Sequence, residues 1–475
     1  MSKDKNILVV DLDGSLIRSD LLHESFWSAI GINILNIFRA VIAAVKGRAQ
    51  LKQFLYENSN IDVATLPYNA HVVAYIDSHR KTGGYTALVT AANFHLAEKI
   101  NQHLRLFDEV KGSTATANLK GKMKADYLVN RFGENGFSYI GDATADLTVW
   151  KISSKAIAVN AQSSLRKKIE ALGKPHHYID AAQPYWTNIF KALRLHQWLK
   201  NTLVFMPMLA SHQITGAHIL SSALAFLVFS LFASSIYVLN DLVDLSADRR
   251  HPRKRFRPFA SGVLPANYGI NLLLGLLALA SVIAVVMVPA ILLLMLLYVL
   301  INLAYSTKLK QVATLDIMTL SGLYCLRIWV GGVATGIDIS FWLIVFSLFF
   351  FLSLAAIKRQ AELVDIKTRG VADIAGRGYT VNNLPFITMG GLGTGYLAVL
   401  VLAFYTFSPE VTALYNTPSA LLGACLILSY WLTRLVLVTN HGGMTDDPII
   451  FAITDRVSHV CLGLIIAIVV SGAIL

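Results

Sequence analysis

The sequence predicts an α/β domain built on a parallel sheet, followed by an all-α membrane domain of about nine transmembrane helices. The chain of 475 residues is 55% hydrophobic and only 15% charged, a balance that is too apolar for an ordinary soluble protein. Polar and apolar segments alternate over residues 1–190, whereas long apolar runs fill residues 202–475. The first pattern is typical of a soluble α/β domain, and the second is typical of membrane-spanning helices.

The N-terminal part contains three short apolar runs, and polar side chains follow each of them. Such runs indicate buried parallel strands, and open α/β sheets bind ligands at the carboxyl ends of their strands. The runs are residues 6–10, 85–89 and 137–140, and the polar residues are Asp11 and Asp13, then Thr90, then Asp142 and Asp146, with Lys124 before the third run. Because the first strand begins so close to Met1, we expect no signal peptide.

This order of Asp-x-Asp, threonine, lysine and Asp-x-x-x-Asp resembles the haloacid dehalogenase-like phosphohydrolase superfamily, over about residues 1–160. The resemblance implies a Rossmann-like fold in which Asp11 is the nucleophile that takes the phosphoryl group. It implies that Asp13 is the general acid and base, and that Thr90 and Lys124 bind the transferring phosphoryl group. An aspartyl phosphate divides one difficult hydrolysis into two easier steps.

The same resemblance implies a magnesium site made of carboxylates. Its members are Asp11, Asp13, Asp142 and Asp146. Magnesium and a lysine together neutralise the charge on phosphoryl oxygens. Lys120 and Lys122 compete with Lys124 for the lysine role, and a catalytically silent domain of the same fold is the alternative to an enzyme.

Residues 20–80 lie between the first two strands and are expected to be helical. Such an insertion resembles the helical cap of the same superfamily. Within it, residues 26–45 are strongly apolar and contain one charged residue, Arg39. Two explanations stay open: this helix contributes a core face of the cap, or it lies on the bilayer and admits a lipid substrate to the cap. Residues 161–190 are expected to be a linker.

Residues 191–475 are expected to form the membrane domain, because they contain apolar runs of membrane-spanning length. The predicted helices are at 202–213, 217–240, 267–287, 289–305, 314–335, 341–357, 384–407, 416–438 and 457–475. The first run is short and the third and fourth nearly touch, so the sequence allows seven to nine helices.

Basic residues gather in alternate loops of this domain. Residues 249–257 contain six of them, whereas the loops near 211–217, 335–340 and 408–415 contain none. This asymmetry predicts an integral protein of a bacterial inner membrane whose N-terminal domain is cytoplasmic. It also accounts for most of the formal charge of +12. The basic loops favour an anionic membrane surface as partner over nucleic acid, which requires a basic stripe on a soluble face.

Residues 240–262 combine three carboxylates with six basic residues. Asp241, Asp244 and Asp248 have helical spacing, so one face of a continuous helix would carry all three. Carboxylates at a membrane-buried helix end are costly unless they are compensated, and Mg²⁺ prefers such hard oxygen ligands. The segment therefore predicts a metal–diphosphate site at the edge of the bilayer.

The pattern Asn-Asp-x-x-Asp-x-x-x-Asp, from Asn240 to Asp248, resembles the UbiA superfamily of intramembrane transferases. Branches that transfer a prenyl group usually carry a second acidic cluster in an inner loop. Here that cluster is reduced to Asp316, because Leu320 stands where its second carboxylate would be.

The reduced cluster resembles the decaprenyl-phosphate phosphoribosyltransferase branch, and so do three segments, RLHQWLKN at 194–201, HPRKRFRPFASG at 251–262 and IKRQAEL at 357–363. One departure is Leu195, where a proline is common. That branch moves 5-phosphoribose from phosphoribosyl diphosphate to a polyprenyl phosphate. The resemblance implies catalytic and metal-binding roles for Asp241 and Asp244, with Asp248 as a further metal ligand.

Two phosphorylated substrates require several cations besides the magnesium. The candidate substrate-binding residues are Lys200, Asn240, Lys254, Arg255, Arg257, Lys308, Lys310, Asp316, Lys358 and Arg359. Because the transfer product would keep a 5-phosphate, the soluble domain is expected to remove it. The alternatives are a prenyltransferase that uses a prenyl diphosphate and a small acceptor, and a transporter or membrane anchor with a regulatory domain.

Overall fold

The computed structural model describes residues 6–114, 117–180, 185–370, 377–444 and 447–474. The chain forms two compact units, and each is described by itself. The first consists of Met1–Leu195 and Ser234–Gly275, and the second of His196–Ala233 and Leu276–Leu475. The acidic motif, residues 240–248, therefore packs with the α/β domain, although the sequence predicts it in the membrane domain.

The first unit contains a six-stranded parallel sheet with strand order β3-β2-β1-β4-β5-β6. The strands are β1 (Ile7–Val10), β2 (Tyr85–Asn93), β3 (Glu109–Ser113), β4 (Ser138–Gly141), β5 (Lys155–Val159) and β6 (His176–Ile179). Alternate residues of β1 point to opposite faces: Leu8 and Val10 join one apolar core, and Val9 joins the other. The predicted fold class is confirmed.

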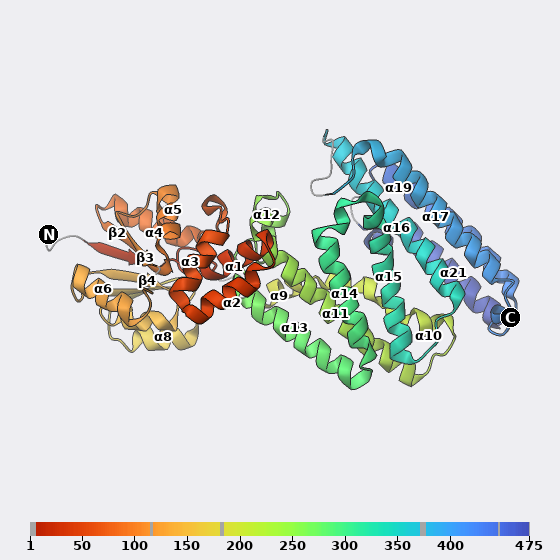
Figure 1. The fold of residues 1–475 in the computed structure, drawn as a ribbon, viewed down its shortest axis with the longest axis horizontal. Coiled ribbons are helices and arrows are strands. Elements are labelled where there is room, and N and C mark those ends of the chain that lie inside the picture. Colours follow the sequence, from red (N-terminus) through yellow and green to blue (C-terminus); the bar gives the residue numbers. More distant parts are fainter. Residues whose placement is uncertain (1–5, 115–116, 181–184, 371–376, 445–446, 475) are drawn as a thin grey trace. The chain divides into compact units, whose positions relative to one another are not determined.

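Helices cover both faces of this sheet, α4 and α5 on one side and α6 and α8 on the other (Figure 1). Their bounds are α4 (Ala70–Lys81), α5 (Phe94–Leu104), α6 (Lys122–Phe132), α7 (Leu147–Trp150) and α8 (Ser163–Glu170). The sheet extends past residue 160, since α8 and β6 lie in the expected linker and β6 pairs with β5. Residues 181–184 of that linker lie outside the described residues.

Three helices between β1 and β2 form the cap. They are α1 (Leu21–Ile32), α2 (Asn36–Lys46) and α3 (Arg48–Asn58). Asp20 caps α1 by accepting hydrogen bonds from the backbone nitrogens of Leu22 at 2.8 Å and His23 at 3.2 Å, which satisfies donors that a helix start leaves open. Gly47, with φ 125°, makes the turn between α2 and α3.

The same unit includes the ends of two long helices and the segment between them. These elements are α9 (Tyr185–Leu193), the end of α11 (Gly216–Val243), α12 (Leu245–Arg250), η4 (Lys254–Phe256) and the start of α13 (Ala266–Met287). Trp27 of α1 shares an apolar cluster with Val238 and Leu242 of α11 and with Phe259. Burial of each such side chain contributes about 1.5–3 kcal/mol, so the cap is packed on the end of α11.

The second unit is entirely helical in its described residues. It contains residues 216–233 of α11 and 276–287 of α13. Its other elements are η3 (Leu195–Phe205), α10 (Met206–Ala210), α14 (Ala290–Thr307), η5 (Leu309–Gln311), α15 (Ala313–Thr335), α16 (Phe341–Thr368), η6 (Val381–Asn383), α17 (Leu384–Tyr405), α18 (Pro409–Thr412), η7 (Pro418–Ala420), α19 (Leu421–Asn440), α20 (Pro448–Thr454) and α21 (Arg456–Ile474). The largest core of this unit joins α15, α16 and α19.

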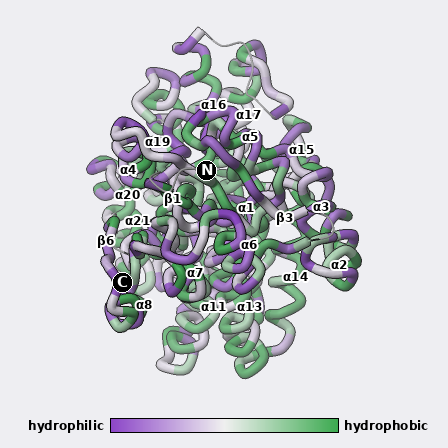
Figure 2. The backbone as a smooth tube through the Cα atoms, turned by 90° about the vertical axis from the view of Figure 1, so that its left-hand side faces the viewer, coloured by the Kyte–Doolittle hydropathy of each residue, from purple (hydrophilic) through white to green (hydrophobic). Residues whose placement is uncertain are grey.

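Within the described residues, seven helices are long and apolar enough to cross a membrane. They lie at Gly216–Val243, Ala266–Met287, Ala313–Thr335, Phe341–Thr368, Val381–Tyr405, Pro418–Asn440 and Arg456–Ile474. The tube through α11 and α13 is largely hydrophobic (Figure 2). Ala290–Ser306 is apolar but shorter, and residues 202–213 contain the end of η3 and the short α10. The expected number of nine was therefore approximate.

Candidate functional site

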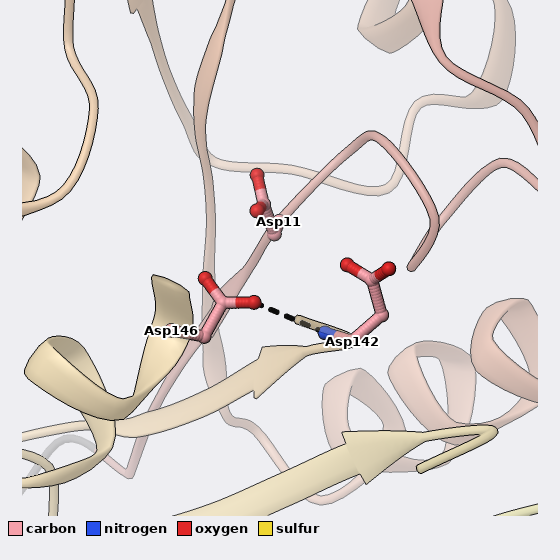
Figure 3. Close-up of side chains that lie close together, drawn as sticks. All are labelled: Asp11, Asp142 and Asp146. Carbon is pink, nitrogen blue, oxygen red and sulfur yellow. Dashed lines mark hydrogen bonds between the residues drawn. The ribbon is translucent and has the colours of Figure 1, made fainter. Parts of the chain in front are cut away.

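Three carboxylates meet at the carboxyl ends of β1 and β4, which are neighbours in the sheet. Asp11 follows β1, Asp142 follows β4, and Asp146 ends the short helix η2 (Thr144–Asp146). One oxygen of each lies within 4.8 Å of the others, and the side chains face a common space (Figure 3). Carboxylate oxygens are the ligands that Mg²⁺ prefers, so this donor set fits the predicted magnesium site.

Hydrogen bonds and one glycine fix the geometry of this group. Asp146 accepts hydrogen bonds from the backbone nitrogens of Asp142 at 3.1 Å and Ala143 at 3.0 Å, and from the Tyr139 hydroxyl at 2.9 Å. Gly14 has φ +72°, and a Cβ there would lie 2.1 Å from Oδ2 of Asp142. Only a glycine lets the loop after β1 approach Asp142 so closely.

The structure brings Lys124 to the carboxylates. Its Nζ lies 2.9 Å from Oδ1 of Asp11 and donates to the Tyr139 hydroxyl at 3.0 Å. Burial alone would lower the pKa of Lys124, but the charges of Asp11 and Asp146 outweigh burial and raise it. Lys122, one of the alternatives, is exposed. Lys124 is thus placed to balance negative charge beside Asp11.

Asp13 and Thr90 are placed differently from the three grouped carboxylates. Asp13 accepts a hydrogen bond from the backbone nitrogen of Leu21 at 2.8 Å, and burial followed by the nearby Asp20 carboxylate raises the pKa of Asp13. Thr90 is fully buried inside β2, where its hydroxyl accepts a hydrogen bond from the Ala92 nitrogen at 3.0 Å. Its assignment as a phosphoryl ligand stays a prediction.

A cavity of about 360 Å³ opens over these side chains. The first turn of α13, with its neighbour Pro265, forms part of the cavity wall through Asn267 and Tyr268. The charged residues of the remaining wall are Asp11, Asp13, Arg18, Asp20, Lys120, Lys124, Asp142 and Asp146. The segment that follows the acidic motif therefore begins and ends in the first unit, and its end at Pro265 borders this cavity.

Lys52 of α3 is a site residue that the sequence did not predict. It lines a second cavity of about 320 Å³, beneath the cap, together with Asp13 and Lys120. Its Nζ donates to Oδ1 of Asn118 at 2.7 Å and to the carbonyl oxygen of Ala91, and burial lowers its pKa. A single lysine in a polar helix carries no pattern that would distinguish it from a solvated one.

The acidic motif forms a second polar group in the same unit. Nη1 of Arg257 lies 2.6 Å from Oδ2 of Asp248 and 3.1 Å from Oδ1 of Asp241. Arg194 also pairs with Asp241, and Nζ of Lys254 lies 3.9 Å from Asp248. Both acids are buried, so the guanidinium groups supply the compensation that buried carboxylates require.

Asp244 differs from the expectation of one continuous helix face. The helix is interrupted at Asp244, between α11 and α12. Asp244 has φ −91° and ψ 10°, and its side chain is exposed. Asn240 is half-buried, and its carbonyl oxygen accepts the Asp244 N–H at 2.9 Å. The three carboxylates are of the donor type that Mg²⁺ prefers, and arginines are the charge partners of two of them. Among the described residues only Asp11, Asp142 and Asp146 form a group close enough to hold a metal ion, so a metal site at the acidic motif stays a prediction.

Arg250, Arg253, Lys254 and Arg255 of this loop are exposed. Arg255 places its guanidinium 4.8 Å from the ring centre of Phe256, and Lys254 is exposed beside it. In the second unit, Lys308 is exposed and Lys310 is half-buried in η5. Their assignment to substrate binding stays a prediction.

Asp316 in the second unit is fully buried and is the counter-ion of Arg359. Nη2 of Arg359 donates to Oδ1 of Asp316 at 3.0 Å, and the Tyr305 hydroxyl donates to the same oxygen at 2.8 Å. Arg377 lies 3.6 Å away, and Arg359 also reaches Glu362 at 2.6 Å. The acid therefore holds a buried arginine in a fixed orientation.

Lys200 and Lys358 converge on Asp447, an acid that the sequence did not predict as a site residue. Oδ2 of Asp447 accepts hydrogen bonds from Lys200 at 2.6 Å and from Lys358 at 3.0 Å. Burial alone would raise the pKa of Asp447, but the charges of Lys358 and Lys200 hold it below its usual range. Burial, followed by the charge of Lys358, lowers the pKa of Lys200 to about 8. Two ammonium groups share one carboxylate, which favours binding of a further anion.

Comparisons with known proteins add family evidence. The model of the UbiA prenyltransferase family matches residues 202–447. The uncharacterized protein y4nM of Sinorhizobium fredii is 36% identical over 454 residues, which cover 95% of this chain and 88% of that protein. The decaprenyl-phosphate phosphoribosyltransferase of Mycobacterium tuberculosis is 35% identical over 279 residues, 57% of this chain and 88% of that protein. The structure of a substrate-bound phosphoserine phosphatase is 16% identical, covers 35% of this chain and 91% of its own, and gives a TM-score of 0.27.

Proposed function

Because the chain belongs to the UbiA prenyltransferase family, we propose that its membrane domain transfers 5-phosphoribose from phosphoribosyl diphosphate to a polyprenyl phosphate. The observation that carries this proposal is the 35% identity to a decaprenyl-phosphate phosphoribosyltransferase, which extends over 88% of that relative. The reduction of the second acidic cluster to Asp316 agrees with it.

The seven candidate spans and the family make this chain an integral membrane protein. We propose that the membrane is a bacterial inner membrane and that the α/β domain lies on its cytoplasmic side. The support is the positive charge of the loop at residues 249–257, since basic loops stay on that side.

In this proposal the acidic motif binds the donor diphosphate. Asp241, Asp244 and Asp248 would hold Mg²⁺, which when bound stabilises the charge of a leaving diphosphate. Arg194 and Arg257 pair with two of these acids and would also hold diphosphate oxygens, because arginine binds phosphate through two parallel hydrogen bonds. Preorganised charges of this kind contribute much of the rate in phosphoryl and glycosyl chemistry.

The acceptor side needs cations but no strong base, because a lipid phosphate is already anionic. Lys200 and Lys358, which share Asp447, are the residues that we assign to a substrate phosphate. Arg359 would bind a second phosphate or a ribose hydroxyl, with Asp316 keeping its guanidinium in place.

The donor is tested with the full chain in lipid vesicles, by supplying labelled phosphoribosyl diphosphate or a labelled prenyl diphosphate and measuring butanol-extractable label. We expect label from the phosphoribosyl donor, and loss of transfer in Asp241→Ala and Asp244→Ala. Asp365→Asn is the matched control, because Asp365 pairs with Arg369 at a surface position of α16. Label from the prenyl donor alone would identify a prenyltransferase instead.

We further propose that the α/β domain removes the 5-phosphate from the lipid-linked product. The observation that carries this step is the cavity above Asp11, Lys124, Asp142 and Asp146, whose wall includes Asn267 of a membrane-spanning helix. A substrate anchored in the membrane would stay close to such a cavity, and tethering raises its effective concentration.

In the proposed hydrolysis, Asp11 attacks phosphorus, and the bond between phosphorus and the ribose oxygen breaks. Asp13 gives the leaving oxygen its proton and later takes one from the water that cleaves the aspartyl phosphate, which releases inorganic phosphate. Lys124 neutralises charge on Asp11 and the phosphoryl oxygens. Asp11, Asp142 and Asp146 would hold Mg²⁺, which when bound shields the phosphoryl group from the charge of its attacker.

This step is tested by giving the full chain a phosphoribosyl lipid and measuring phosphate release. We expect Asp11→Asn to abolish release and Asp77→Asn, at an exposed position of α4, to leave it unchanged. Rapid turnover of a soluble phosphate ester without turnover of the lipid would contradict the proposed substrate.

A further inference from the structure

The cap helix α2 exposes its largest apolar side chains on the surface, whereas a helix of a soluble domain buries such side chains in the core. Phe38 and Val45 are 68% and 84% exposed, whereas Asn36 and Ala40 on the opposite face are 4% and 3% exposed. Asn36 donates to the carbonyl oxygen of Ala29 at 2.9 Å. The apolar segment 26–45 therefore divides in two: Phe26 and Trp27 of α1 pack in a core, whereas the largest side chains of α2 are exposed.

These exposed side chains form one continuous stripe. The stripe consists of Ile34, Phe38, Val41, Ile42 and Val45. The helical spacing of Phe38, Val41, Ile42 and Val45 puts them on one side of α2, and Ile34 lies in the turn directly before this helix. A compact apolar stripe of this kind on a protein surface marks an interaction site.

The charges around the stripe are all of one sign. Between Glu24 and Glu57 the sequence contains no acidic residue. The basic residues Arg39, Lys46 and Arg48 are exposed beside or directly after the stripe. An apolar face bordered by basic residues is typical of helices that lie in the interface of an anionic membrane.

The position of α2 within its unit points to the same partner. A Cβ at Gly31 would lie 3.4 Å from the carbonyl oxygen of Val243, the last residue of the membrane-spanning helix α11. Phe26, Trp27 and Ile30 of α1 belong to the apolar cluster around that helix end. The stripe begins at Ile34, a few residues further along the chain, so it starts near the point where α11 ends.

We propose that the stripe on α2 inserts into the surface of the lipid bilayer that the chain's own helices cross. The apolar side chains would lie below the headgroups, and Arg39, Lys46 and Arg48 would contact anionic headgroups. The apolar face then continues the lipid-facing surface of α11 onto the cap. The occupant is the bilayer, rather than a second copy of the chain or a soluble partner.

This placement also determines what reaches the cap. Gly47 joins α2 directly to α3, and Arg48 and Lys52 of α3 line the cavity beneath the cap together with Asp13. A phosphate ester whose lipid tail stays in the bilayer would meet these cations first. This last step alone rests on the proposed phosphatase function.

The test uses the full chain carrying Val41→Cys, labelled with an environment-sensitive NBD probe. It is reconstituted in vesicles of phosphatidylcholine and phosphatidylglycerol, with nitroxide-labelled lipids as quenchers. The parent chain gives the background from Cys325, Cys425 and Cys461. Lys168→Cys, at an exposed position of α8, is the matched control. We expect a blue-shifted emission and quenching several-fold stronger at position 41 than at position 168.

Equal quenching at the two positions would overturn the proposal. Energy transfer between labelled copies without quenching would overturn it as well, and would identify a second copy as the occupant. Replacing Phe38 and Ile42 by aspartate should reduce quenching at position 41 to the control value. Because quenching requires no turnover, a chain that fails to hydrolyse any phosphate ester would contradict the proposed phosphatase and leave the membrane result standing.

Discussion

Arg249 donates two hydrogen bonds to Glu24, at 3.0 Å and 2.6 Å, and the two side chains are only 5% and 1% exposed. Arg249 belongs to α12, one residue after the acidic motif, and Glu24 belongs to the cap helix α1. Ser19 donates a further hydrogen bond to Glu24 at 2.5 Å. The pair joins the cap to the segment that follows the motif.

Loss of one partner of this pair should destabilise the first unit strongly. Removal of one partner of a buried ion pair leaves an uncompensated charge, which costs about 3–5 kcal/mol. We expect Glu24→Ala and Arg249→Ala each to lower the midpoint of thermal unfolding in detergent by several degrees. The double variant Glu24→Met with Arg249→Met should be less destabilised than either single one. Additive losses would show that the two residues do not interact.

We expect Gly14 to be required for the position of the Asp142 carboxylate, and not only for the backbone conformation of its own loop. A Cβ at Gly14 would lie 2.1 Å from Asp142, whereas one at Gly83, whose φ is +80°, would meet nothing within 4 Å. We expect Gly14→Ala to reduce phosphate release at least tenfold while transfer to lipid continues. Gly83→Ala carries the same backbone strain and should keep full activity, so similar losses in both would refute a specific role of the close approach.

The choice between Lys124 and Lys122 can be decided by matched substitutions. Lys124→Met removes the charge beside Asp11, and charged groups at such positions contribute roughly a hundredfold or more in rate. Lys122→Met changes an exposed residue two positions away in the same helix. Phosphate release should fall only in the first variant, with kcat affected more than KM. A loss confined to Lys122→Met would move the assignment to that residue.

Transfer should decline in mildly alkaline solution. Lys200 carries its charge below its pKa of about 8 and loses it above that value, so binding of an anionic substrate should weaken as the pH rises through this range. Arginine keeps its charge throughout, and Lys200→Arg should therefore move the decline to higher pH. The measurement is the rate of label transfer from pH 6 to pH 10, and superimposable profiles would argue against a role of this ammonium group.

The parts of the site that depend on a single strand were predictable from sequence. An apolar run followed by Asp11 or Asp142 is a local pattern, and a parallel sheet then brings the two strand ends together. Which lysine lies beside Asp11 depends on the phase of α6, which begins after Gly121 with φ +58°. Helix phase follows from the exact starting residue, and this is the least predictable property of a helix.

Other parts depend on contacts that no local pattern contains. Asp447 binds Lys200 and Lys358, which lie 247 and 89 positions away in the chain. The prediction that the three acids share one helix face requires an unbroken helix, whereas the helix is interrupted at Asp244. Strand β6 lies within the predicted linker, because edge strands can be short and polar and His176 and His177 are exposed.

The packing of α1 against α11 and α12 determines which fragments of the chain can fold by themselves. A fragment that stopped near residue 190 would uncover Trp27 and would leave Glu24 buried without its arginine. Such a fragment should precipitate or bind chaperones, so residues 1–190 are not an independent module. The shortest fragment that keeps these contacts must therefore include α11 and α12 together with the α/β domain.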